Sequence, residues 1–270
     1  MTEPLLSLAN VSKTFRGRSA FRPAAETHAV QDVSLEVAPG ETVALVGESG
    51  SGKSTLSRLA LRLTDVTSGR IIFDGNDVTR VRGRGLRTLR RELSVVFQDP
   101  YTSLNPRQTV ARIVSGPLRN HGLPRDQKTL IDLITSVGLE PEHLDRYPHQ
   151  FSGGQRQRIG IARALATQPR MIIADEPVSA LDVSIRAQIL NLLGDLRDER
   201  GLALLVVSHD LAVVRGIADR VAVMQNGRLV ESGPVEQIYA DPKDPYTRSL
   251  LAAVPVPDPH RRSRPLPTST

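Results

Sequence analysis

The sequence contains no cysteine and no long apolar segment. The absence of cysteine excludes disulfides, thiolate zinc sites, iron–sulfur clusters and cysteine nucleophiles. The longest strongly apolar run is LALLVV, residues 202–207, which is far shorter than the roughly 18 residues that span a bilayer. The N-terminal residues lack the basic start, apolar core and cleavage site of a secretory signal. We therefore expect a chain that stays in the cytosol and has no segment within a membrane.

Positive charge is concentrated in one short stretch. The net charge of +6 comes mostly from arginine, and six arginines lie in residues 80–91. Such a cluster can attract nucleic acid or anionic lipid, although a solvated helix and loop surface is the simpler interpretation. No aromatic residue lies between these arginines, which argues against a platform for stacking single-stranded nucleic acid. We expect no direct binding of nucleic acid.

The order of apolar segments predicts an α/β fold. A strand at residues 42–46, a glycine-rich loop and a helix from Lys53 to about Leu63 form the first unit of a parallel sheet. An Asn226-Gly227 turn predicts a hairpin near the end of the sheet. The other predicted strands share short, β-branched apolar runs between turn signals. They are residues 5–11, 33–37, 69–78, 94–97, 171–175, 202–208 and 220–224.

Between these strands the pattern becomes helical, from Asp99 to about Ala166. Apolar residues in 130–137 recur with helical spacing, and Gly138 supplies a left-handed stop. The last residues are polar and rich in proline, which predicts disorder. We therefore divide the chain into three parts. They are an α/β catalytic lobe of residues 1–98 and 167–235, an inserted helical lobe of residues 99–166, and a C-terminal extension with its tail, residues 236–270.

The loop after the strand at 42–46 has the pattern of a phosphate-binding loop. Its sequence GESGSGKST fits G-x-x-x-x-G-K-[ST] between a predicted strand and a predicted helix. Backbone N–H groups of such a loop surround phosphate, and the helix N-terminus adds positive charge. We expect Lys53 to reach the β- and γ-phosphates and Ser54 to bind Mg²⁺; a glycine-rich loop without a ligand is the alternative. The predicted nucleotide contacts are Gly47, Glu48, Ser49, Gly50, Ser51, Gly52, Lys53, Ser54 and Thr55.

Four polar residues follow predicted strands. Asp175 ends the strand at 171–175 and Glu176 follows it; Asp175 can hold Mg²⁺ through water and Glu176 can polarise an attacking water. An acidic pair that caps a helix is the structural alternative. His209 and Gln98 follow two other strands, and Gln98 can offer its amide oxygen to Mg²⁺ or to the attacking water. Taken alone, each is more often a structural or surface residue.

These residues stand in a definite order with two further motifs. The order is GESGSGKST, Gln98, FSGGQ at 151–155, MIIADEP at 171–177, SALD at 179–182 and His209. In this order the chain resembles the ATPase domain of ABC transporters over nearly its whole length. The resemblance implies a RecA-like P-loop NTPase fold, in which an N-terminal antiparallel β subdomain and an inserted α-helical subdomain accompany the parallel sheet. It also implies ATP and Mg²⁺ as cofactors.

Roles follow from the resemblance residue by residue. Glu176 is expected to be the catalytic base, His209 the γ-phosphate sensor and Gln98 a switch that senses metal and water, with Lys53 completing the catalytic set. The aromatic ring that stacks on adenine is expected at Phe15, with Phe21 as the alternative. The expected metal ligands are Ser54, Gln98 and Asp175.

The FSGGQ motif is expected to act on a second subunit. Ser152, Gly153 and Gly154 open a helix whose N-terminus is a second anion site. In the family this segment, with Gln155, faces the ATP bound by a partner subunit, and Asp182 lies at the same interface. We expect two ATPase subunits that hold ATP between them.

Two stretches are similar to the peptide importer ATPases, a group that includes nickel and some glutathione and sugar importers. They are FQDPYTSLNPRQTV (97–110) and DPKDPYTRSLLAAVPVPDP (241–259), although Asp244 replaces the usual histidine. This similarity implies two transmembrane permease subunits, an extracytoplasmic solute-binding protein and a second ATPase subunit, with a heterodimer preferred to a homodimer. It places the chain peripherally on the cytoplasmic face of the inner membrane. The permeases are expected to dock near residues 98–106, with Tyr101 and Leu104 as contacts.

The motifs disfavour two other classes of protein. Soluble ABC ATPases that act on DNA or ribosomes need long coiled-coil arms, zinc modules or two fused halves, and this sequence contains none of them. A regulatory nucleotide-binding module without hydrolysis would not need both Glu176 and His209. The cargo, whether dipeptide, oligopeptide, nickel or another solute, is selected by proteins other than this chain.

Overall fold

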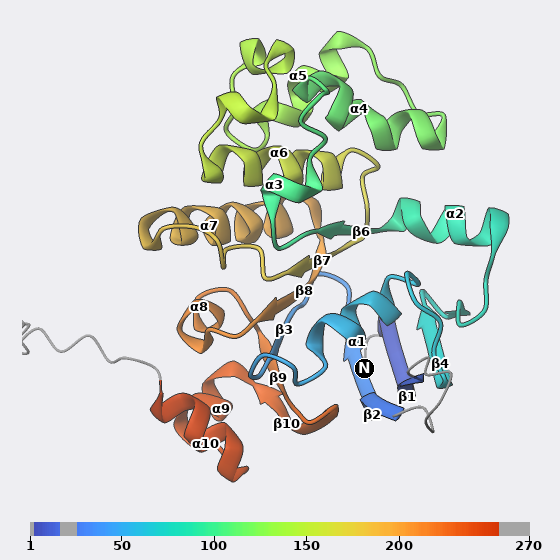
Figure 1. Cartoon of the computed structure of the whole chain (residues 1–270), viewed down its shortest axis with the longest axis vertical. Coiled ribbons are helices and arrows are strands. Elements are labelled where there is room, and N and C mark those ends of the chain that lie inside the picture. The colour runs from blue at the N-terminus through green and yellow to red at the C-terminus, as the bar shows by residue number, and fades with distance from the viewer. Residues whose placement is uncertain (1–2, 17–25, 254–270) are drawn as a thin grey trace, which may run out of the picture.

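A computed structural model describes residues 3–16 and 26–253, and the strands form two sheets (Figure 1). One is a four-stranded antiparallel sheet of order β2-β1-β4-β5. The other has six strands in the order β10-β9-β3-β8-β7-β6. The strands are β1 Leu6–Arg16, β2 Glu26–Val37, β3 Thr42–Val46, β4 Ser68–Phe73, β5 Asn76–Asp77, β6 Leu93–Val96, β7 Met171–Asp175, β8 Ala203–Ser208, β9 Arg220–Gln225 and β10 Arg228–Pro234.

The six-stranded sheet is parallel except at one edge. β3 pairs in parallel with β8 on one side and β9 on the other, whereas β10 runs antiparallel to β9. All five residues of β3 and all six of β8 are buried. A parallel sheet that is covered on both faces requires such continuous apolar strands. The carboxyl ends of β3, β7 and β8 therefore meet at one edge of the sheet.

The helices are distributed unevenly around the sheets. In Figure 1, α4, α5 and α6 gather beyond one end of the six-stranded sheet, while α9 and α10 lie at the opposite end. None of the helices in the described part of the chain is long and apolar enough to span a membrane. The α-helices are α1 Lys53–Ala60, α2 Gly83–Glu92, α3 Pro100–Ser103, α4 Val110–His121, α5 Gln127–Thr135, α6 Gly153–Leu165, α7 Val183–Arg200, α8 Leu211–Arg215, α9 Val235–Ala240 and α10 Pro245–Ala252, and the 3-10 helices are Pro141–Asp145 and Pro148–Gln150.

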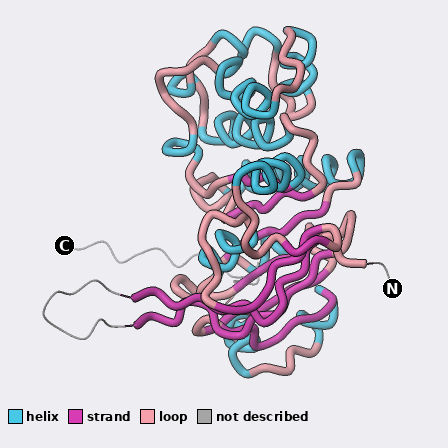
Figure 2. The backbone as a smooth tube through the Cα atoms, turned by 90° about the vertical axis from the view of Figure 1, so that its right-hand side faces the viewer, coloured by secondary structure: helices cyan, strands magenta, loops and turns pink. Residues whose placement is uncertain are grey.

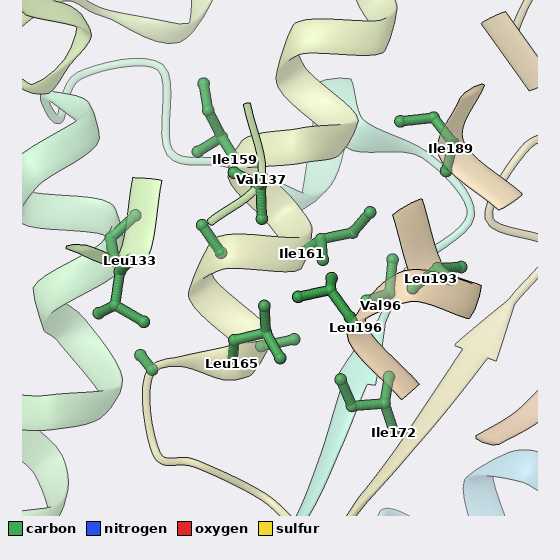
Figure 3. Close-up of a cluster of buried hydrophobic side chains, with 14 of the residues drawn as sticks. Val96, Leu133, Val137, Ile159, Ile161, Leu165, Ile172, Ile189, Leu193 and Leu196 are labelled. Carbon is green, nitrogen blue, oxygen red and sulfur yellow. The ribbon is translucent and has the colours of Figure 1, made fainter. Parts of the chain in front are cut away.

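A shared hydrophobic core joins the helical part of the chain to the sheet. Ile161 of α6, Ile172 of β7 and Leu196 of α7 belong to one buried cluster (Figure 3). A second cluster lies between the antiparallel sheet, α1 and strands of the six-stranded sheet. The helical part of the chain therefore has no separate core, since the apolar faces of its helices are buried partly against α7 and the sheet.

The predicted fold class is confirmed, with differences at the ends of elements. β6 is Leu93–Val96, one residue earlier than predicted, so that Phe97 lies outside the strand and is 41% exposed. The helix that starts at Lys53 ends at Ala60, earlier than predicted. β1 and β2 form a long pair that projects from the body (Figure 2). The predicted C-terminal disorder and Phe21 lie outside the described residues.

Candidate functional site

The phosphate loop connects β3 to α1 and is confined by the neighbouring strand β9. Gly47 has a φ of 150°, and a Cβ atom on it would lie 2.1 Å from the carbonyl oxygen of Met224. The turn after β9 also touches the loop, because the N–H of Gly227 donates to the carbonyl of Ser51 at 2.9 Å. A side chain at Gly47 would therefore displace either the loop or β9.

Lys53 is buried at the start of α1, and its ammonium group points into the loop. Nζ donates to the carbonyl oxygens of Gly47 and Glu48, both at 2.7 Å. Burial lowers the pKa of Lys53, although nearby carboxylates partly oppose the shift. Gly52 precedes α1 and provides no side-chain cap, so the first N–H groups of α1 are not capped by a side chain. The loop thus combines a positive charge with helix N–H donors, which fits a phosphate.

Ser54 and Asp175 lie together at the carboxyl edge of the sheet. The Ser54 hydroxyl donates to a carboxylate oxygen of Asp175 at 3.5 Å. Burial, followed by the charge of Glu176, raises the pKa of Asp175 above its ordinary value. A divalent cation beside this carboxylate would stabilise its charged form against both burial and the charge of Glu176. The hydroxyl and the carboxylate are also the oxygen donors that Mg²⁺ prefers. The residues present therefore fit a magnesium ion.

Glu176 is held in an unusual conformation at the end of β7. Its φ is 46°, which is uncommon for a residue with a side chain. Its N–H donates to the carbonyl of Val207 at 3.0 Å, and its own carbonyl accepts from the N–H and the hydroxyl of Ser179 at 3.3 and 3.2 Å. These backbone bonds fix the direction of a carboxylate that the sequence pattern could only place next to the strand.

Gln98 and His209 converge on this carboxylate. The Gln98 Nε2 donates to Glu176 Oε2 at 2.8 Å, and His209 Nδ1 lies 3.3 Å from the same oxygen. The structure therefore brings three of the predicted catalytic and switch residues together. The Gln98 amide nitrogen makes this contact, and the role of its amide oxygen towards Mg²⁺ or the attacking water stays a prediction.

A pocket of about 450 Å³ lies over the loop. Six of its lining residues were not predicted. They come from β2 and from the turn after β9, and Gln31 of β2 donates to the carbonyl of Asn226 in that turn at 3.0 Å, across 195 positions of sequence. The Asn226-Gly227 turn was visible in the sequence, but its position over the loop was not. The lining residues are Thr27, His28, Ala29, Gln31, Ser49, Gly50, Gly52, Lys53, Ser54, Thr55, Glu176, Asn226 and Gly227.

Phe15 lies on β1 next to this pocket. It pairs with Thr27, a lining residue, in the β1–β2 register. Paired residues of antiparallel strands point to the same face of the sheet. The Phe15 ring is 45% exposed, with Lys13 Nζ 5.1 Å from its centre. An aromatic surface is thus available beside the pocket.

The FSGGQ segment forms the N-terminus of α6, away from the pocket. Ser152 caps the helix: its hydroxyl accepts from the Gln155 N–H at 3.3 Å, and the Gln155 side chain accepts from the Ser152 N–H at 3.1 Å. A Cβ atom on Gly154 would lie 2.6 Å from Ile185 Cγ2, and one on Gly153 would lie 3.2 Å from Leu181 Cδ2. The glycine pair therefore allows α6 to approach the start of α7 closely. In Figure 1, α6 and α1 belong to different parts of the molecule, so their N-termini do not meet within this chain.

Asp182 and the two predicted docking residues differ in their exposure. Asp182 is exposed at the N-terminus of α7. Tyr101 is 59% exposed, and the Arg156 guanidinium lies 4.1 Å from its ring centre. Leu104 is 1% exposed and belongs to the core beneath α6. The prediction that Leu104 contacts a permease was wrong, because its side chain fills the core.

Comparison with known proteins identifies the family. Residues 30–179 match the family model described as ABC transporter. The chain belongs to the ABC transporter family. Residues 230–270 match a second model, described as Oligopeptide/dipeptide transporter, C-terminal region. The predicted resemblance to the peptide importer group is thereby confirmed.

Several curated relatives of this ABC protein carry the same name. "Glutathione import ATP-binding protein GsiA" of Escherichia coli (strain K12) is 54% identical over 265 residues, covering 96% of this chain and 42% of that protein. GsiA of Pectobacterium atrosepticum is 52% identical over 267 residues, covering 97% and 43%. The chain spans about two-fifths of the length of these relatives, 42% and 43%.

Solved structures of ABC cassettes share the fold. The dimeric ATP-binding cassette MJ0796 bound to ADP and Pi has a TM-score of 0.74 and 32% identity, covering 85% of this chain and 98% of that one. The protein cbiO1 from Clostridium perfringens has a TM-score of 0.77 and 29% identity, covering 88% and 92%. The chain thus has the fold of an ABC ATP-binding cassette, as predicted.

Proposed function

We propose that this chain is the ATP-hydrolysing subunit of an importer that takes up short peptides, glutathione among them, across the cytoplasmic membrane. One observation carries the proposal. The same chain contains the phosphate loop, the contact between Gln98 and Glu176, and a C-terminal region of the oligopeptide/dipeptide transporter type. The name of the GsiA relatives supports glutathione as one cargo. Nickel or another small solute is the alternative cargo within the same group.

The residues at the carboxyl edge of the sheet have complementary roles in hydrolysis. Ser54 would hold Mg²⁺ directly and Asp175 through water, and the metal supplies positive charge to the phosphate oxygens when bound. Lys53 exchanges its hydrogen bonds to the loop carbonyls for phosphate oxygens. Glu176 accepts a proton from the attacking water, while Gln98 and His209 orient the carboxylate. Phe15 provides a stacking surface for the base.

The position of the FSGGQ segment supports a mechanism shared between two subunits. Ser152, Gly153 and Gly154 start a helix that does not face the pocket of its own chain, and Asp182 is exposed. We assign these residues to the ATP held by a second ABC ATPase subunit, preferably a different chain and otherwise a second copy. Hydrolysis then separates the two subunits and changes the permeases attached to them.

A groove next to Phe97 supports docking of a permease. Leu63 and Phe97 are 49% and 41% exposed, although isolated apolar residues at a surface are common. They line a groove of about 230 Å³ together with residues of α2, α4 and α6. Because the groove lies between the sheet and the helical part, a permease segment in it would contact both parts. A solute-binding protein outside the cell would deliver the cargo, and the chain itself would lie on the cytoplasmic face of the inner membrane.

Reconstitution tests this function. The chain is purified with its co-isolated permeases, placed in vesicles with the solute-binding protein, and supplied with ATP. Uptake of glutathione, a dipeptide, a tetrapeptide and Ni²⁺ is measured separately, with Lys53→Ala as the control without hydrolysis. Uptake of a peptide that depends on Lys53 supports the proposal. Uptake of Ni²⁺ alone, or hydrolysis without any transport, contradicts it.

A further inference from the structure

The C-terminal region packs against the elements that carry the catalytic loops. Tyr239 of α9 and Tyr246 and Leu250 of α10 contact a buried cluster that contains Val46 of β3 and Val214 of α8. β3 leads into the phosphate loop, and α8 follows His209. The region that distinguishes this group of ABC proteins is therefore adjacent to both sides of the site.

Tyr246 contacts the phosphate loop directly. The N–H of Glu48 donates to the Tyr246 hydroxyl at 2.9 Å, across 198 positions of sequence. The carbonyl of Glu48 accepts from Lys53 at 2.7 Å. Glu48 is thus held on one side by the catalytic lysine and on the other by the C-terminal region. Burial raises the pKa of Tyr246 above its ordinary value.

Tyr239 makes a similar contact with the segment that follows His209. Its hydroxyl donates to the carbonyl of Leu211, the first residue of α8 and the second after His209. Burial raises the pKa of Tyr239 to about 12. The phenol therefore remains a donor over the whole physiological range of pH.

The position of Tyr246 is fixed by the residues that start α10. Asp244 caps this helix by accepting from the Tyr246 N–H at 2.8 Å, which gives a structural role to the aspartate that replaces the usual histidine. Glu231 of β10 accepts from the N–H groups of Lys243 and Asp244 at 2.7 and 3.0 Å. The start of α10 is therefore tied to the sheet.

We propose that Tyr246 and Tyr239 are positioning residues for ATP hydrolysis: Tyr246 holds the phosphate loop at Glu48, and Tyr239 holds the segment that carries His209. Neither hydroxyl lines the nucleotide pocket, so both act through the loops that they hold. The inference rests on the ABC ATPase activity and does not depend on the cargo. It gives the C-terminal region a part in catalysis.

Two phenylalanine variants test the inference, because Tyr246→Phe and Tyr239→Phe keep the rings and remove only the hydroxyls. Affinity for MgATP is measured on the full chain, and turnover on the reconstituted transporter. For Tyr246→Phe we expect KM and Kd for ATP to rise about five-fold with kcat nearly unchanged, since a hydrogen bond of ordinary net strength is lost from the loop. For Tyr239→Phe we expect kcat to fall about three-fold or more with Kd unchanged. Tyr147→Phe, in the helical part, is the control and should alter neither constant.

Hydrogen exchange provides a second measurement that does not require turnover. The Glu48 amide should be protected in the unmodified chain and should exchange faster in Tyr246→Phe but not in Tyr239→Phe. A Tyr246→Phe protein with unchanged KM and unchanged Glu48 exchange would overturn the role of Tyr246, even if its thermal midpoint fell. Unchanged kcat in Tyr239→Phe would overturn the role of Tyr239. If the unmodified reconstituted protein hydrolyses ATP but transports none of the tested solutes, that result counts against the proposed importer function and leaves both tyrosine roles standing.

Discussion

The Gln98 side-chain amide lies 2.8 Å from the Glu176 carboxylate, although 78 positions separate the two residues. Gln98 begins the segment that leads to α3, and Glu176 directly follows β7, so the contact links the groove beside Phe97 to the proposed hydrolytic centre. A shift of the segment that carries Gln98 would change the orientation of the proposed base. The proposed docking and the proposed hydrolysis can therefore influence each other through one hydrogen bond.

Replacement of Glu176 by glutamine should separate binding from hydrolysis. The amide keeps the shape of the side chain but cannot accept a proton from water, so we expect about a 10²-fold or greater loss of turnover. Affinity for ATP should change little. Phosphate release and nucleotide affinity are measured side by side, with Glu199→Gln on the exposed end of α7 as the control. Turnover near the unmodified value would remove Glu176 from the role of base.

Two glycines of α6 provide a matched pair. Gly154→Ala places a methyl group 2.6 Å from Ile185 Cγ2, whereas Gly160→Ala meets nothing within 4 Å. We expect Gly154→Ala to lower the free energy of unfolding by about 1–3 kcal/mol and Gly160→Ala to raise it by about 0.5–1 kcal/mol. Ile185→Ala combined with Gly154→Ala should recover part of the loss. Denaturant titration measures the free energy of unfolding of each variant. Equal changes in this free energy for Gly154→Ala and Gly160→Ala would contradict the packing explanation.

Asp175→Asn should stabilise the nucleotide-free protein and abolish the effect of Mg²⁺. A buried carboxyl whose pKa is raised in the folded state disfavours folding once pH exceeds its unfolded pKa, and asparagine removes that charge. The difference in thermal midpoint between the two proteins should therefore grow as pH rises from the acidic range towards neutrality. Thermal unfolding with and without MgATP measures both effects. A variant that is destabilised at neutral pH would show that the charge is not disfavoured there.

Leu104 and Tyr101 should behave differently although they are three positions apart. Leu104→Ala removes a buried side chain and should cost about 2–5 kcal/mol of stability. Tyr101→Ala should leave stability nearly unchanged and reduce the stimulation of ATP hydrolysis by the permeases. Chemical denaturation and ATPase assays with and without the permeases measure the two outcomes. If the permeases stimulate ATP hydrolysis by Tyr101→Ala as strongly as that of the unmodified chain, Tyr101 does not belong to the docking surface.

The sequence predicted the strands but not their order in the sheet. Short apolar runs identify β3, β7 and β8, but the pairing of β3 with β8, which joins Thr42 to Leu204, leaves no local pattern in the sequence. Likewise, the phosphate-loop motif located Lys53 and Ser54, whereas the pocket residues Thr27 and Asn226 come from segments that fold over the loop. The conformation of Glu176, with its positive φ, depends on hydrogen bonds to β8 and Ser179 and could not be predicted from the residue type. The roles of Ser152 and Asp182 remain predictions, since they concern a second chain.

The place of β3 in its sheet has a consequence for biosynthesis. β3 ends at Val46, yet both strands beside it, β8 and β9, lie between Ala203 and Gln225. Synthesis must therefore pass residue 203 before this fully buried strand finds either neighbour, and until then the strand is open to aggregation or to a chaperone. Ribosomes stalled before residue 203 should carry polypeptides that proteases digest readily, and resistance should arise only after β9 has emerged.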